Sequence, residues 1–175
     1  MFEISKSFDF CYGHRVFTQE LDPELSCNMS CKCRHIHGHQ GQINIYLSGN
    51  ELDKRGMVID FNELQWFKKW LDETLDHKFI MSVDDPLRKV LFPLSFNSVI
   101  KPEGHGIVQY DVYKNQPQEI VELYDGLVLV PFVPTSENLS KWIWEIIDKK
   151  IGHLCKVSRV QFFETPKSQS NYYSE

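Results

Sequence analysis

The sequence lacks any apolar run near the roughly 18 residues that a membrane-spanning helix needs. Its first ten residues carry Glu3, Lys6 and Asp9 and lack the apolar core of a signal peptide. We therefore expect a cytoplasmic protein with no membrane partner. A basic excess is also lacking, since the formal net charge is −5 at pH 7. This balance disfavours a general nucleic-acid binder, whose surface should be basic.

The cysteines do not suggest a disulfide framework. There are five, an odd number, and three of them crowd between Cys27 and Cys33. In a reducing compartment this arrangement favours metal binding or catalysis. Cys11 and Cys155 lie in expected strands, where we interpret them as buried small apolar residues.

Periodicity predicts an α+β domain. Alternating apolar residues indicate strands near 4–16, 40–47 and 155–164. Asp60 is the expected N-cap of a first helix, and Thr135 or Ser136 caps a second. The apolar stripes of these helices are Leu64, Phe67, Leu71 and Leu75, then Leu139, Trp142, Ile143 and Ile146. Because two of the strands suit a hairpin, we expect an antiparallel sheet with both helices on one face.

With 175 residues, the chain is long enough for a single domain spanning residues 1–175. The span 82–132 contains several prolines and fits none of these elements. We interpret it as a β-rich insertion, with strand-like runs at 106–113 and 119–130.

The motif richest in chemistry runs from Cys33 to His39. His37 and His39 point the same way if the backbone is extended, because side chains alternate along a strand. His14 ends the first expected strand, and a hairpin would bring it beside them. Three neutral imidazoles with one open position would hold Zn²⁺ as a Lewis acid. The rival interpretation is a structural zinc bound by Cys27, Cys31 and Cys33 with a histidine, although that spacing is atypical.

Two further positions have both a functional and an ordinary interpretation. The adjacent Asp76 and His77 can form an acid–base pair, or His77 can simply interact with the dipole of the preceding helix. Glu164 lies at the end of an apolar strand. In the functional interpretation its carboxylate accepts two hydrogen bonds from the N–H edge of a heterocycle. In the ordinary interpretation it is an exposed charge at the end of a strand.

In order along the chain, these pieces resemble the 6-pyruvoyl- and 6-carboxy-tetrahydropterin synthase family. The matching segments are Phe8–Arg15, Cys33–His39, Gly56–Phe61, Leu75–His77, Pro134–Leu139 and Glu164–Thr165. The resemblance implies the tunnelling fold (T-fold), whose subunits assemble into a barrel. It also implies a homohexamer of two stacked trimers, with active sites between subunits.

The resemblance also implies site residues. His14, His37 and His39 would be the zinc ligands, Cys33 the catalytic thiol, and Asp76 and His77 its acid–base partners. The pterin would be anchored by Glu164, in a pocket lined by Thr135, Ser136 and Glu137. The implied substrate is 7,8-dihydroneopterin triphosphate. The candidates for binding its phosphates are Arg15, Lys32, Arg34, Lys78 and Lys167.

Spacing favours one branch of the family. Three residues separate Cys33 from His37, which resembles the 6-carboxy-tetrahydropterin synthases of the queuosine pathway, a class of lyase that releases acetaldehyde. Five residues separate Cys31 from His37, as in the 6-pyruvoyl enzymes, which eliminate triphosphate and keep the carbon chain. A non-catalytic pterin-binding paralogue is the third alternative. The inserted span can serve as a lid, alter a subunit interface or change the substrate.

Overall fold

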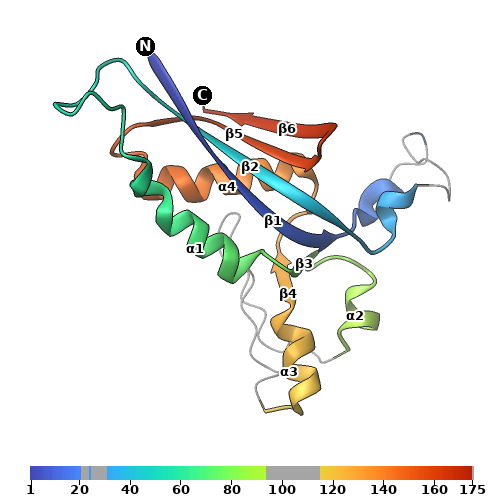
Figure 1. Ribbon diagram of the computed structural model, residues 1–175. Coiled ribbons are helices and arrows are strands. Elements are labelled where there is room, and N and C mark those ends of the chain that lie inside the picture. Colours follow the sequence, from blue (N-terminus) through green and yellow to red (C-terminus); the bar gives the residue numbers. More distant parts are fainter. Residues whose placement is uncertain (21–23, 25–30, 94–114, 175) are drawn as a thin grey trace. The chain divides into compact units, whose positions relative to one another are not determined.

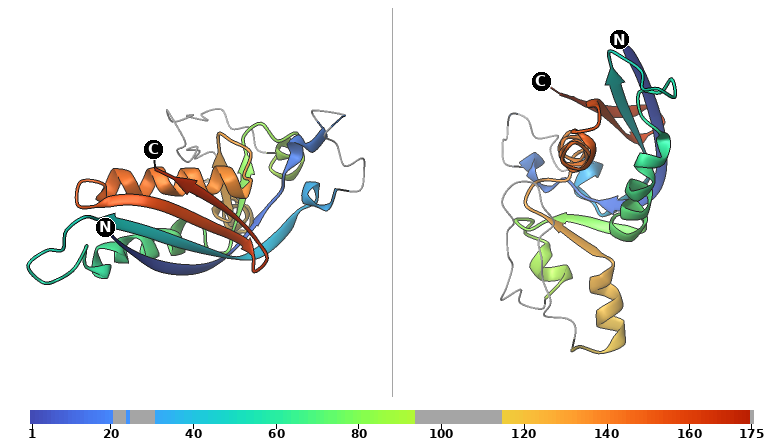
Figure 2. Two further views of the ribbon diagram at one scale, coloured as in Figure 1. Left: turned by 90° about the horizontal axis from the view of Figure 1, so that it is seen from above. Right: turned by 90° about the vertical axis from the view of Figure 1, so that its left-hand side faces the viewer.

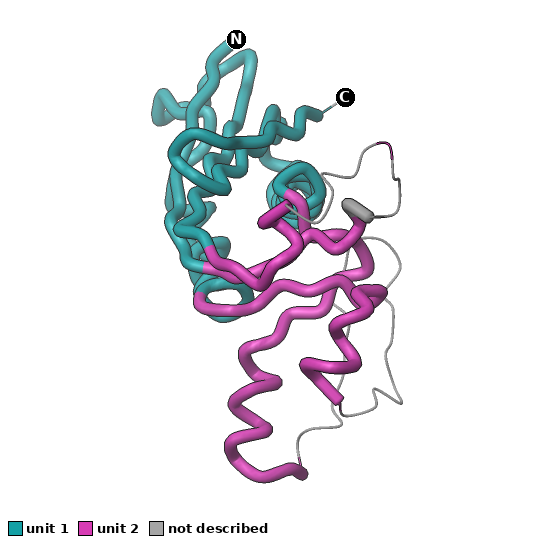
Figure 3. The backbone as a smooth tube through the Cα atoms, turned by 90° about the vertical axis from the view of Figure 1, so that its right-hand side faces the viewer, with its two compact units in different colours: residues 1–11, 39–76, 136–175 teal, residues 12–38, 77–135 magenta. Residues whose placement is uncertain are grey.

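The computed structural model describes residues 1–20, 24, 31–93 and 115–174. Figure 1 shows the course of the chain. The elements in order are β1 (Phe2–His14), η1 (Phe17–Glu20), η3 (Lys32–Arg34), β2 (His37–Gly49), η4 (Phe61–Leu64), α1 (Gln65–Thr74), β3 (Lys78–Ser82), α2 (Arg88–Leu91), α3 (Gln118–Asp125), β4 (Leu127–Val130), α4 (Ser136–Ile151), β5 (Lys156–Thr165) and β6 (Ser168–Tyr173). The chain divides into two compact units, residues 1–11, 39–76 and 136–175, and residues 12–38 and 77–135 (Figure 3).

The strands form a six-stranded sheet in the order β4-β3-β1-β2-β5-β6. The expected α+β class is confirmed, and β2, β5 and β6 pair antiparallel. The sheet is mixed, however, because β3 pairs parallel with the last three residues of β1 and β4 pairs parallel with β3. We did not predict β3 or β6 from the sequence.

The core of unit 1 follows the predicted periodicity. Ile43, Ile45 and Leu47 alternate along β2 and are buried, as expected for one face of a strand. The stripe of the first helix, from Leu64 to Leu75, is also buried. Each fully buried side chain of this kind contributes about 1.5–3 kcal/mol to folding. Figure 2 shows α1 and α4 on the same face of the unit 1 strands, and the rings of Trp70 and Trp142 meet with centroids 5.7 Å apart.

A side-chain cap explains where the first helix begins. The side chain of Asp60 accepts a hydrogen bond from the backbone N–H of Asn62 at 2.9 Å, which starts η4 directly before α1. Helix α4 begins at Ser136, so Thr135 directly precedes its first residue. Its buried stripe includes Ile147, whereas the predicted Ile146 is only half-buried.

The inserted span is more helical than predicted. Residues 119–125 belong to α3, so the predicted strand there is wrong, whereas Leu127–Val130 forms strand β4 as expected. Helix fits because Ile120 and Tyr124, four residues apart, both pack against a small apolar cluster that includes Phe92. The other predicted strand, 106–113, lies outside the described residues.

Across the part of the chain that the structure describes, none of the helices has the length and apolarity required to cross a membrane.

Candidate metal centre and active site

The structure brings together the three histidines that we identified from the sequence. His14 ends β1, where it lies opposite Ile80 of β3 and is fully buried. Its ring centroid is 4.6 Å from that of His37, at the start of β2. His39 follows two residues later on the same strand and so projects from the same face. One ring nitrogen from each histidine lies within 4.8 Å of the other two.

Backbone carbonyls orient two of these rings. Nδ1 of His14 lies 2.7 Å from the carbonyl oxygen of Pro134, and Nδ1 of His37 lies 2.8 Å from that of His35. A carbonyl can only accept a hydrogen bond, so we assign the proton in each ring to Nδ1. This tautomer leaves the lone pair on Nε2, as a metal-binding histidine requires. The donor set therefore fits a divalent metal such as Zn²⁺.

Two glycines allow the backbones to approach at this point. A Cβ atom on Gly13 would lie 2.7 Å from the ring of Phe79 and 3.3 Å from the carbonyl oxygen of His37. A Cβ atom on Gly38 would lie 3.1 Å from the carbonyl oxygen of Tyr12. Larger residues would force apart the strand ends that carry His14 and His37.

Glu164, the predicted pterin anchor, lies beside the third histidine. Its Oε1 is 3.5 Å from Nε2 of His39, and the two side chains are 26% and 16% exposed. The carboxylate is therefore accessible while it remains next to a candidate metal ligand.

Asp76 and His77 lie in the tight turn between α1 and β3. Oδ1 of Asp76 accepts a hydrogen bond from the backbone N–H of Cys11 at 2.7 Å, which fixes the carboxylate against β1. His77 has φ +58° and is the one non-glycine residue with positive φ in the described ranges. This conformation costs about 1–2 kcal/mol for a residue with a Cβ atom. Such strain is often retained at functional positions.

The structure does not add Asp76 and His77 to the histidine cluster. They form a separate group with Cys11, whose sulfur lies within 4.8 Å of a ligand atom of each. Sequence reasoning missed Cys11, and its predicted burial is wrong because the residue is exposed. Cys155 also differs from expectation, since it is half-buried and precedes β5.

The candidate thiols occupy a short turn before β2. Cys33 lies in η3 and is exposed, whereas Cys31 directly precedes this helix and is half-buried. The carbonyl oxygen of Cys33 accepts a hydrogen bond from the backbone N–H of Val16 at 2.8 Å, which ties the turn to the segment after His14. Cys27, the third member of the rival zinc site, lies outside the described residues.

The start of α4 carries the predicted pocket residues. The hydroxyl of Ser136 donates to Oε2 of Glu137 at 3.3 Å, and the carbonyl oxygen of Ser136 accepts from the hydroxyl of Ser170 at 2.6 Å. Thr135 follows Pro134, the residue whose carbonyl orients His14. The chain leading into α4 is thus tied to a candidate metal ligand.

Two of the candidate phosphate-binding residues are engaged elsewhere. Arg15 is buried in an ion pair with Asp85, so it is unsuitable as a surface cation. Nζ of Lys78 donates to the carbonyl oxygen of Asp125 at 2.7 Å. Lys32 and Lys167 are exposed and Arg34 is half-buried, which leaves these three as candidates.

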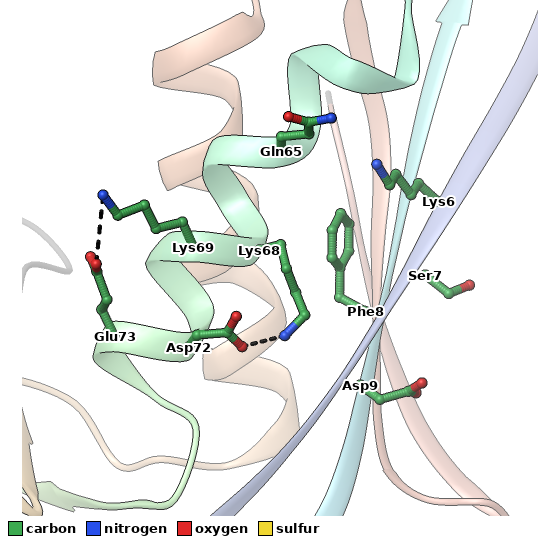
Figure 4. A pocket seen from close by; sticks show the side chains of 9 residues that line it. All are labelled: Lys6, Ser7, Phe8, Asp9, Gln65, Lys68, Lys69, Asp72 and Glu73. Atoms are coloured by element: carbon green, nitrogen blue, oxygen red, sulfur yellow. Dashed lines mark hydrogen bonds and ion pairs between the residues drawn. The ribbon is translucent and has the colours of Figure 1, made fainter.

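A large cavity lies elsewhere in unit 1, between β1 and α1, with a volume of about 770 Å³ (Figure 4). Lys68 pairs with Asp72 and Lys69 pairs with Glu73 along its wall. None of the predicted catalytic, metal-binding or pterin-binding residues lines this cavity, so it is not the candidate active site.

An α+β fold whose sheet carries a cluster of three histidines defines a candidate metal-dependent protein. The sequence model of 6-pyruvoyl tetrahydropterin synthase matches residues 3–175, and the chain belongs to this family. A 6-carboxy-5,6,7,8-tetrahydropterin synthase of Aquifex aeolicus is 28% identical, with 99% of this chain and 98% of that protein covered. A protein of Pyrococcus abyssi named as a possible enzyme of the same kind is 30% identical over 87% of this chain and 84% of its own.

Solved structures show the same fold. An uncharacterised protein of Wolinella succinogenes is 46% identical, with a TM-score of 0.88 over 99% of this chain and 98% of that one. The 6-pyruvoyl tetrahydropterin synthase of Caenorhabditis elegans has a TM-score of 0.61 over 99% of this chain and 96% of its own. At 20% identity, the second likeness supports the fold alone.

Proposed function

We propose that the protein is a zinc-dependent 6-carboxy-5,6,7,8-tetrahydropterin synthase. It would convert 7,8-dihydroneopterin triphosphate and one water molecule to 6-carboxy-tetrahydropterin, acetaldehyde and triphosphate. The observation that carries this proposal is the cluster of His14, His37 and His39, with two of its rings oriented by backbone carbonyls. The name of the Aquifex relative and the spacing of Cys33 from His37 support the carboxy branch.

His14, His37 and His39 would hold the zinc ion, which would supply a Lewis acid for the side-chain hydroxyls of the substrate. Cys33, as thiolate, takes a proton from the substrate side chain and returns it. Its exposed position in η3 suits this role, and nearby positive charge would favour the thiolate. His77, held by its backbone turn and oriented by Asp76, exchanges protons at another atom of the side chain.

Glu164 would hold the pterin ring. A carboxylate can accept two parallel hydrogen bonds from the N–H and NH₂ groups of the pterin, which fixes a flat ring in one orientation. The proximity of Glu164 to His39 would place that ring next to the metal. Thr135, Ser136 and Glu137 would line the same pocket from the start of α4.

The alternative in the same family is 6-pyruvoyl-tetrahydropterin synthase, with Cys31 as the thiol. The five-residue spacing between Cys31 and His37 favours it, whereas the half-buried state of Cys31 favours Cys33. A non-catalytic pterin-binding paralogue would keep pterin affinity but show no turnover.

We also propose a single tunnelling-fold domain, with the inserted span at about 82–132, that assembles as a homohexamer. Strand β6 is the last strand of the sheet. The outer edge of such a strand is a natural site for pairing with another copy of the chain. We also propose that the protein acts in the cytoplasm, in queuosine biosynthesis.

Turnover by metal-free and zinc-reloaded protein tests the proposal. Zinc should restore product formation to wild-type protein and to Cys31→Ala, but not to Cys33→Ala. Loss of turnover in Cys31→Ala with retention in Cys33→Ala would select the alternative thiol. If zinc-loaded protein bound pterin but consumed no dihydroneopterin triphosphate, the enzymatic proposal would be wrong.

A further inference from the structure

Arg15 and Asp85 form a buried ion pair within unit 2. Their side chains are 7% and 0% exposed, and Nη1 of Arg15 lies 3.3 Å from Oδ1 of Asp85. Arg15 directly follows His14, whereas Asp85 lies in the turn after β3, inside the inserted span. Burying two opposite charges carries a desolvation cost that their attraction often fails to recover. The pair therefore requires an explanation beyond packing.

Asp85 is held firmly by its own turn. Its Oδ1 accepts a hydrogen bond from the backbone N–H of Leu87 at 2.9 Å. Its backbone N–H donates to the carbonyl oxygen of Ser82 at 3.2 Å, and its carbonyl oxygen accepts from Arg88 at 3.0 Å. The carboxylate is thus a fixed anion at the start of the inserted span. Nη1 of Arg15 faces its Oδ1 at ion-pair distance without a hydrogen bond, so the contact between the two residues is electrostatic.

Arg15 lies between two contacts that shape the candidate site. On one side, the ring of His14 is oriented by the carbonyl oxygen of Pro134. On the other side, the backbone N–H of Val16 donates to the carbonyl oxygen of Cys33 at 2.8 Å. A shift of Arg15 would move the backbone of both neighbours, and with it a metal ligand and the thiol-bearing turn.

We propose that the Arg15–Asp85 pair is a positioning device through which the inserted span holds His14 and the turn around Cys33 in place. Neither residue touches the metal or the substrate in this account. The proposal rests on the proposed zinc site, but not on which reaction the site performs. It gives the inserted span a function in the active site.

Four variants of the full-length protein test this inference. Asp85→Asn keeps the shape of the side chain and removes its charge, while Arg15→Lys keeps a charge and removes the planar fork. The double variant Arg15→Met/Asp85→Leu replaces the pair by apolar groups of similar size, a change that often preserves stability. Glu119→Gln is the control, because Glu119 is an exposed carboxylate elsewhere in the inserted span.

Three readouts avoid substrate entirely. They are the zinc dissociation constant from competition with a chelator, the alkylation rate of Cys33 in metal-free protein, and the thermal midpoint. We expect Asp85→Asn and Arg15→Lys to weaken zinc binding by about 10–100-fold, as for other groups that orient metal ligands. Both should also change the Cys33 alkylation rate, whereas Glu119→Gln should leave all three readouts unchanged.

The double variant separates positioning from stability. We expect it to recover the thermal midpoint but neither the zinc affinity nor the alkylation rate of Cys33. If a folded double variant kept the wild-type zinc affinity and the wild-type alkylation rate of Cys33, the proposal would be overturned. The ion pair would then contribute to stability alone. If the double variant fails to fold, wild-type zinc affinity and Cys33 reactivity in Asp85→Asn would overturn it equally. A failure to make carboxypterin would leave these readouts unaffected.

Discussion

Zinc should stabilise the folded protein, and removal of one ligand should abolish that stabilisation. His14 lies on β1, and His37 and His39 lie on β2, so the three rings meet only when these strands are in place. If the cluster holds zinc as proposed, zinc should bind the folded chain in preference to the unfolded one. At a free zinc concentration one hundred times Kd, binding should stabilise the folded state by about 2.7 kcal/mol.

For a chain of this length, that free energy corresponds to a rise in the thermal midpoint of about 5–11 °C. The best test variant is His37→Ala. His37 is half-buried and its Nδ1 hydrogen bond is to its own loop, at His35, so the substitution should disturb packing little. In contrast, His14 is fully buried and a substitution there would confound metal loss with a cavity.

The assay is thermal unfolding of metal-free protein, with and without zinc. Wild-type protein and His35→Ala should show the rise, and His37→Ala should not. His35 is a suitable control because it is an exposed histidine two residues from His37. An equal rise in His37→Ala and wild-type protein would refute the assignment of His37 as a ligand. No rise in wild-type protein would refute a zinc site that forms on folding.

Three other predictions follow from particular residues. Phe67→Ala should lower the free energy of unfolding in urea by about 3–5 kcal/mol, because Phe67 is fully buried and its ring meets Phe8 edge-on at 5.1 Å. The free energy of unfolding in urea should be about 1–2 kcal/mol higher for His77→Gly than for His77→Ala, because glycine accepts positive φ. Both variants should lose turnover. Burial raises the pKa of the Cys155 thiol, so its alkylation should be slower than that of exposed Cys11 and should require higher pH.

Each of these predictions has a contradicting outcome. A loss in Phe67→Ala no larger than that of a surface substitution would mean that α1 does not pack as described. Equal stability of the two His77 variants would remove the argument from backbone strain. If Cys155 and Cys11 reacted alike at every pH, the burial of Cys155 would not affect its ionisation.

The raised pKa of Cys155 also makes stability depend on pH, because the folded state favours the neutral thiol. Any stability that this thiol contributes is complete below its pKa in the unfolded chain. That stability is lost as pH rises through its raised pKa in the folded protein.

The sequence predicted the elements whose apolar residues repeat at a clear period. The alternation of Ile43, Ile45 and Leu47 predicted β2, and the spacing from Leu64 to Leu75 predicted the first helix. The shared face of His37 and His39 could be predicted from the two-residue period of a strand alone, because the two residues belong to one short segment. Local pattern was sufficient for these features.

The missed elements depend on contacts far apart in the sequence. Strand β3 is only five residues long, and its parallel partners are the end of β1 and the later β4. Strand β6 is polar, and the burial of Ser170 follows from its bond to the carbonyl oxygen of Ser136. Neither feature leaves a periodic apolar pattern.

Cys11 is a different case, since a local signal was present. Phe8, Phe10 and Tyr12 alternate on the buried face of β1, which places Cys11 on the opposite face. Its proximity to Asp76 and His77 could not be predicted in the same way, because it depends on how the turn after α1 meets β1.

The most direct test of the central claim is the ratio of acetaldehyde to triphosphate released by zinc-loaded protein from 7,8-dihydroneopterin triphosphate. The proposed carboxy branch predicts equal molar amounts of both, together with 6-carboxy-tetrahydropterin in the mass spectrum. Triphosphate without acetaldehyde, together with a pyruvoyl product, would contradict this claim and assign the protein to the other branch of the family.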